Sequence, residues 1–155
     1  MTDYLVYWKI GNVREALRTQ NWSHACWGSG RGDFETKFAA GDRIYFNTID
    51  EEGHHYVFSK MVLDRYSGSK EDTDKMVPFS LYQVPFNSYW MGGEPWVVPC
   101  LIPFGSLART LDFKSGRVLP PGYNGQHLQA IRELTQTDSL AIEQLISSFS
   151  GRESV

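Results

Sequence analysis

Residues 21–32 (NWSHACWGSGRG) concentrate side chains that could bind a flat or charged ligand. Indole and guanidinium faces stack on planar groups, and an imidazole offers a hydrogen bond that responds to pH. The glycines at 28, 30 and 32 would let a ligand approach the backbone closely. We therefore expect a binding loop here, with Trp27 partly exposed. The alternative is that Trp22 and Trp27 are wedges in a small core, because tryptophan is highly buried on average.

Catalytic motifs are missing from the sequence. It contains no GxSxG, P-loop, HExxH or GxGxxG pattern. His54 and His55 are adjacent in a predicted strand, so their rings point to opposite faces and are poorly placed to hold one metal. Cys26 beside His24 could form a nucleophile and base, but no third orienting group is evident, so a buried structural cysteine is the default. We expect no catalytic residue, no metal and no cofactor.

Composition indicates one globular domain. The chain has 155 residues, 41% hydrophobic and 21% charged, and we expect a domain over residues 1–150 with a tail at 151–155. Cys26 and Cys100 are far apart and indicate free thiols in a reducing compartment. No stretch is apolar enough for a membrane span and no signal peptide is evident. The sequence therefore predicts a cytoplasmic protein with no membrane partner.

Charge argues against broad binding to duplex DNA. The formal net charge is −3, whereas non-specific duplex binding depends on many lysines and arginines at phosphates. Any affinity for nucleic acid should come from a pocket more than from a basic surface. The residues expected at phosphates are Arg14, Arg18, Lys37, Lys60 and Arg65.

The hydrophobic pattern predicts an α+β fold built on a mostly antiparallel barrel or curled sheet with packed helices. A helix over 12–20 is expected to begin with Asn12 as its cap, and a last helix over 139–149 with Thr137 as its cap. Segments 67–75 and 85–95 are predicted loops. Strands are expected at 4–8, 43–48, 54–63, 77–84, 96–102 and, as a short piece, 111–113.

Tryptophans beside glycine-containing loops fit base recognition. Trp22, Trp27, Trp90 and Trp96 all fall in or beside such loops. A flipped base is read by stacking between aromatic faces, and each stacked base contributes roughly 1–3 kcal/mol. An aromatic slot could thus offset an unpairing cost of a few kcal/mol with few phosphate contacts.

Several short motifs, taken in order, resemble one known family. They are YLVYWK at 4–9, SHA at 23–25, Gly-Asp at 41–42 opening an apolar strand, and NGQHLQAIRELT at 124–135. Together they resemble the EVE-like branch of the PUA superfamily, whose relatives include the YTH, ASCH and SRA domains. The likeness is to small EVE-type domains that occur alone or fused to HNH nucleases in prokaryotic modification-dependent restriction systems. It covers residues 4–65 and 111–146.

That resemblance implies a PUA-like curled barrel with flanking helices and an aromatic pocket at one rim. Such pockets accept a modified base, for example 5-methylcytosine, 5-hydroxymethylcytosine or N6-methyladenine. The implied pocket residues are Trp8, Lys9, Trp22, His24, Trp27, Arg31, Asn47 and Thr48, with Trp90 and Trp96 as further aromatic walls.

The expected function is therefore a non-catalytic module that recognises a modified or flipped base, in DNA more than in RNA. Two alternatives stay open: a small ASCH-like enzyme acting on RNA or a nucleoside, and a protein-interaction module that partners a nuclease. The sequence leaves open which modification is bound and which oligomer forms.

Overall fold

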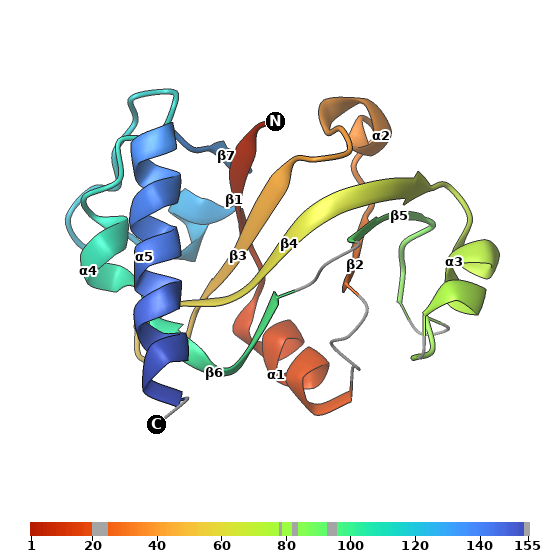
Figure 1. The fold of residues 1–155 in the computed structure, drawn as a ribbon, viewed down its shortest axis with the longest axis horizontal. Helices are drawn as coiled ribbons and strands as arrows, with labels where there is room; N and C mark the ends of the chain where they lie inside the picture. Colours follow the sequence, from red (N-terminus) through yellow and green to blue (C-terminus); the bar gives the residue numbers. More distant parts are fainter. Residues whose placement is uncertain (20–24, 78, 82–83, 93–95, 154–155) are drawn as a thin grey trace.

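The computed structural model describes residues 1–19, 25–77, 79–81, 84–92 and 96–153 (Figure 1). Its strands are β1 (Asp3–Tyr7), β2 (Ala25–Ser29), β3 (Arg43–Ile49), β4 (His55–Ser67), β5 (Ser88–Gly92), β6 (Trp96–Pro103) and β7 (Arg132–Glu133). Its helices are α1 (Ile10–Thr19), α2 (Phe34–Lys37), α3 (Lys70–Met76), α4 (Gly105–Ala108), the 3-10 turn η1 (Gly125–Leu128) and α5 (Gln136–Glu153). Within the described residues, no helix is long and apolar enough to cross a membrane.

The strands form one curled sheet in the order β2-β5-β4-β3-β1-β7, with β6 also paired to β4. β1 and β3 run parallel, and the other pairs are antiparallel. Among the described strands, no pairing joins the two ends of this order, β2 and β7, so the sheet is curled but not closed. The predicted α+β class and the mostly antiparallel curled sheet are confirmed.

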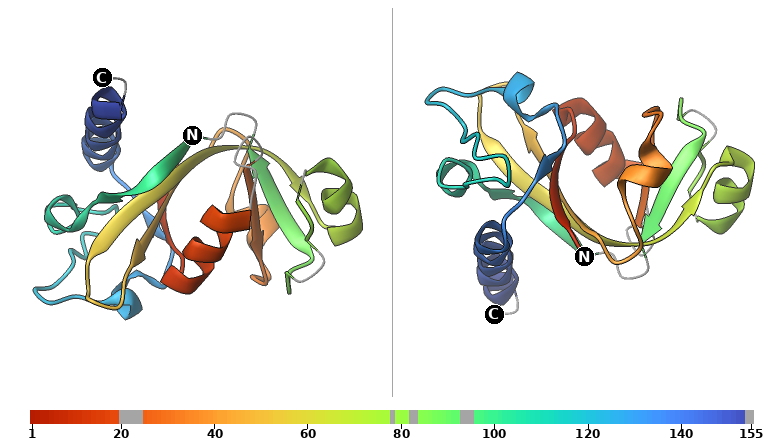
Figure 2. Two further views of the ribbon diagram at one scale, coloured as in Figure 1. Left: turned by 90° about the horizontal axis from the view of Figure 1, so that it is seen from below. Right: turned by 90° about the horizontal axis from the view of Figure 1, so that it is seen from above.

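Both faces of the sheet are covered by a buried cluster. Side chains alternate along each strand, so neighbouring residues enter different clusters. The concave face of the sheet wraps around α1, while α5 lies across the opposite, convex side (Figure 2). On β1, Val6 points into the concave cluster and Leu5 into the convex one. The convex cluster also takes Ile142 and Ile146 from α5. The concave cluster is rich in aromatic rings; its buried ones are Tyr4, Trp27, Phe34, Phe38, Phe46, Phe58 and Trp90.

Both segments predicted as aromatic loops contain a strand. β2 lies within 21–32 and β5 within 85–95, and the two pair with each other, with Trp27 opposite Trp90. The glycine at 28 is needed for this packing, because a Cβ there would lie 2.8 Å from the Tyr89 ring. Gly28 therefore makes room for a side chain of this protein, and the prediction that it makes room for a ligand is wrong.

Other boundaries also differ from the prediction. The described residues of 77–84 and residues 111–113 form no strand, and α3 lies in the predicted loop 67–75, capped by the Ser69 side chain. α1 begins two residues before the predicted cap, with the Lys9 carbonyl accepting from the N–H of Asn12 and Val13.

α5 begins at Gln136. Thr135, just before the helix, and Asp138, in its first turn, form two reciprocal hydrogen bonds. Thr135 Oγ1 accepts from the Asp138 N–H at 3.0 Å, and Asp138 Oδ2 accepts from the Thr135 N–H at 3.1 Å. This is a capping box, with Thr135 in the role that the sequence assigned to Thr137. The helix continues to Glu153, past the domain end expected at 150.

Candidate nucleic-acid interface

The rim at the end of β1 carries a half-buried indole, that of Trp8. Its backbone N–H donates to the Asn47 carbonyl at 2.9 Å, which extends the β1–β3 pairing by one residue. Its ring packs on Phe46 and Phe58, with centroids 5.3 and 5.6 Å apart. The next residue, Lys9, is exposed. Trp8 therefore combines a fixed ring with a partly open surface beside a cation, as a stacking residue requires.

Trp27 lies inside the protein. It is 4% exposed, on a strand, and contacts Phe34, Phe38 and Phe46 edge-on at 4.7–5.7 Å. The prediction of a partly exposed loop residue is wrong, because pairing of β2 with β5 turns this indole into the concave cluster.

Trp90, predicted as a further pocket wall, is also interior. It is 5% exposed, and its Nε1 donates to the Phe34 carbonyl at 2.8 Å. Its ring packs on Tyr66. Both indoles are therefore buried in the core, and for Trp27 the alternative of a core wedge is confirmed.

Asn47 and Thr48 were predicted at the rim, and both are fully buried. A β-bulge at this point of the β3–β4 ladder shifts the register between Phe46 and Asn47. The Asn47 Nδ2 donates to the Val6 carbonyl at 2.9 Å, and its Oδ1 lies 2.7 Å from His55 Nε2. The Asn47 side chain thus links β1 to β4 inside the protein, and both residues are buried where a rim position was predicted.

The basic residues expected at phosphates do not form one patch of free cations. Lys60 is paired with Glu143 on α5 at 3.1 Å and so ties the sheet to that helix. Arg14 and Arg18, both on α1, pair with the exposed Glu51 and Glu15. Lys37 lies over the Tyr4 and Phe38 rings, and the exposed Arg65 contacts the Met76 sulfur.

Three predicted pocket residues lie outside what the structure describes: Trp22, His24 and the side chain of Trp96. Arg31 is described; it is exposed and paired with Asp33 just before α2. The segment that carries Trp22 and His24 joins α1 to β2.

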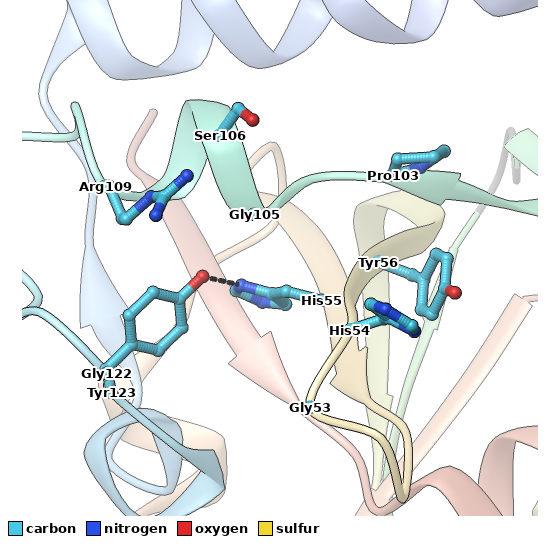
Figure 3. Close-up of a pocket in the computed structure, with 10 residues that line it drawn as sticks. All are labelled: Gly53, His54, His55, Tyr56, Pro103, Gly105, Ser106, Arg109, Gly122 and Tyr123. Carbon is cyan, nitrogen blue, oxygen red and sulfur yellow. Dashed lines mark hydrogen bonds between the residues drawn. The ribbon is translucent and has the colours of Figure 1, made fainter.

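A hollow of about 500 Å³ (Figure 3) lies on the convex side of the sheet. The sequence did not predict it. The turn before β4, the segment 103–109 and the loop at 122–123 meet there. Its floor is His55, whose Nδ1 lies 2.6 Å from the Tyr123 hydroxyl. Burial lowers the pKa of His55 to about 4, so this imidazole is neutral at pH 7. The adjacent His54-His55 pair was a usable signal, since alternation in a strand buries one of the two rings.

Two features weighed in the sequence, the Cys26 thiol and a metal site, can be checked in the described residues. Burial raises the pKa of the Cys26 thiol to about 12, which keeps it protonated and a poor nucleophile. Within the described residues, no group of three or more histidine, cysteine or acidic side chains could hold a metal ion.

Comparison with known proteins identifies the fold. No family model matches the chain, and no curated protein matches it. Among solved structures, it is similar to the N-terminal domain of Thermococcus gammatolerans McrB, solved bound to m5C DNA. The match covers 96% of this chain and 99% of that one, with a TM-score of 0.54 and 12% identity. The fold is PUA-like, as the sequence resemblance predicted.

Proposed function

We propose that this protein is a non-catalytic module that binds a modified base, flipped out of DNA, at the rim of the concave face. The observation that carries this proposal is the half-buried Trp8 indole, packed on Phe46 and Phe58 beside the exposed Lys9. The McrB domain of similar fold was solved bound to m5C DNA, which supports a modified-DNA ligand for this chain too.

In this proposal, the concave aromatic cluster is the support and Trp8 is the reader. Trp27 contacts Phe46 at 5.7 Å, and Phe46 in turn packs on Trp8. The ring of Trp8 is therefore held in place before the ligand arrives, so little side-chain entropy is lost on binding. Trp22 and His24, in the segment between α1 and β2, are proposed to complete the pocket.

Phosphate contacts are proposed for cations near this rim. Lys9, Arg14 and Arg18 belong to α1 or directly precede it, and all three are exposed. The ion pairs of Arg14 and Arg18 are solvent-exposed, so each contributes little and a phosphate can replace the carboxylate. Stacking of roughly 1–3 kcal/mol then supplies much of the affinity for the flipped base.

We expect binding without cleavage, so a nuclease that acts on the bound DNA would be a partner.

The test is a binding titration over matched duplexes with one central base pair, unmodified or carrying 5-methylcytosine, 5-hydroxymethylcytosine or N6-methyladenine. The proposal predicts that one modification is bound at least about fivefold more tightly than the unmodified duplex, a difference on the order of 1 kcal/mol. Equal affinity across the four duplexes would contradict it.

A further inference from the structure

The hollow over His55 has no role in the proposed function, because it opens on the opposite side of the sheet from the concave cluster. His55 contacts Phe104, a member of the convex cluster, at 4.8 Å. The volume of about 500 Å³ is within the range of small-ligand pockets. Glycines at 53, 105 and 122 line it, so much of its wall is backbone without side chains.

A hydrogen-bond chain fixes the chemistry of the floor. Because Asn47 Nδ2 donates to the Val6 carbonyl, Asn47 Oδ1 is an acceptor, and His55 Nε2 must carry the proton that reaches it. The neutral ring then presents Nδ1 as an acceptor, so the Tyr123 hydroxyl donates to it. The lone pairs of the Tyr123 oxygen are left to accept a donor from a ligand.

Arg109 is the one side chain of the lining that always carries a charge, and the lining holds no carboxylate. Arg109 and Ser106 are exposed, and both lie along the upper edge of the hollow, above Tyr123 (Figure 3). Burial raises the pKa of Tyr123, and the nearby positive charge of Arg109 opposes that rise. No carboxylate of the described residues pairs with Arg109.

We propose that this hollow is a second ligand site, which binds a nucleoside 5′-phosphate. Arg109 holds the phosphate through its planar array of donors, helped by the Ser106 hydroxyl. The half-buried rings of Tyr56 and Tyr123 offer apolar surface to the base. The fixed acceptor on Tyr123 selects a ligand with an N–H group, as nucleobases have.

Two sources carry this chemistry: a free nucleotide and an unpaired nucleotide of a DNA strand. The test measures binding of dAMP and dCMP to the whole chain by calorimetry, with the nucleosides and inorganic phosphate as separate arms. Amide chemical shifts of Ser106, Arg109 and Tyr123 report whether binding is at this hollow. Competition by a single-stranded oligonucleotide distinguishes the two sources: displacement identifies the strand, and no displacement identifies the free nucleotide.

The proposal predicts that at least one nucleotide binds with a dissociation constant in the millimolar range or below. Its nucleoside and inorganic phosphate should each bind more weakly than the nucleotide. Arg109→Gln should weaken nucleotide binding about tenfold, the loss expected for one charge-assisted contact, and leave the nucleoside unaffected. The matched control Arg117→Gln removes an exposed arginine outside the hollow and should change nothing. Tyr123→Phe keeps the ring but removes the acceptor, and should weaken nucleotide and nucleoside alike.

Absence of nucleotide binding, shifts confined to other residues, or equal affinity in Arg109→Gln and Arg117→Gln would overturn the proposal. Trp8→Ala should leave nucleotide binding at the hollow intact, so the outcome here is independent of the modified-base proposal.

Discussion

His55 Nε2 lies 2.7 Å from Asn47 Oδ1, so the Asn47 side chain supports the floor of the hollow. The backbone carbonyl of the same Asn47 accepts from the N–H of Trp8, the half-buried indole at the rim. One buried residue therefore anchors both the end of β1 and the floor of the hollow. A substitution at Asn47 should disturb both places, whereas a substitution at Trp8 or Tyr123 should disturb only one.

The burial of Trp27 predicts that Trp27→Ala mainly costs stability. Removing a large ring from the contacts with Phe34, Phe38 and Phe46 leaves a cavity, and the expected loss is about 3–5 kcal/mol of unfolding free energy. Urea denaturation measures it. Leu140→Ala, at a side chain 57% exposed on α5, is the control and should change stability by less than about 0.5 kcal/mol. A Trp27→Ala protein as stable as this control would show that the indole is not a core residue.

The neutral state of His55 predicts a pH dependence of stability. Its pKa is about 4 in the folded protein against 6.5 for the free side chain, so between these values the unfolded chain binds more protons. The contribution of His55 is complete above pH 6.5 and is lost as pH falls towards 4, in total on the order of 3 kcal/mol.

Comparison with His55→Gln isolates this effect, since glutamine does not titrate. The variant should be less stable than the wild type at pH 7, and the difference should shrink as the pH is lowered from 7 to 4. His54→Gln, at the neighbouring exposed position, is the control for the exchange of histidine for glutamine and should change stability at pH 7 by less than about 0.5 kcal/mol. Parallel curves for the wild type and His55→Gln would contradict the buried, neutral imidazole.

The lowered pKa of Glu143 predicts a second loss of stability at low pH. Burial disfavours its charge, but hydrogen bonds from the Tyr45 hydroxyl at 2.6 Å and from Lys60 at 3.1 Å outweigh that and lower its pKa. Its contribution is therefore present above the ordinary glutamate pKa of 4.5 and is lost as pH falls through the lowered value.

Glu143→Gln should lower stability at pH 7 by about 1–2 kcal/mol, because charged hydrogen bonds between β3, β4 and α5 are replaced by neutral ones. The loss should be smaller at pH 3. Glu71→Gln breaks an exposed pair with Lys75 and should cost almost nothing. Thermal melting at the two pH values measures both variants, and an equal cost for Glu143→Gln and Glu71→Gln would refute the structural role of this cluster.

Local patterns were sufficient for the elements whose side chains show a clear alternation or periodicity. The aromatic and β-branched run of β1, the hairpin of β3 and β4 and the apolar face of α5 follow from such patterns. β2 and β5 could not be recognised in this way. Each is short and contains a glycine. β2 is a strand because β5 lies beside it, with Trp27 opposite Trp90, and β5 in turn lies between β2 and β4.

The same limit applies to the predicted site. Whether Lys60 is free for a phosphate depends on Glu143, which is 83 residues away in the chain. Whether Asn47 lies at a rim or in the interior depends on the bulge in the β3–β4 ladder and on His55. Trp8 was correctly placed at the end of the first strand, because strand ends are marked locally by Lys9 and Gly11. Its role as a reader of bases stays a prediction.

The most direct measurement of the central claim is the affinity of Trp8 variants for the preferred modified duplex and its unmodified counterpart. Trp8→Ala should lose about 1–3 kcal/mol of binding to the modified duplex, because the stacking face is gone. It should also lose most of the discrimination, because the flipped base is no longer held in the pocket that reads it. Trp8→Phe should keep part of both. Trp90→Phe removes a buried hydrogen bond to Phe34 and replaces a core indole by a smaller ring, away from the proposed pocket, so the folded variant should keep the discrimination of the wild type. Undiminished discrimination in a folded Trp8→Ala protein would contradict the account.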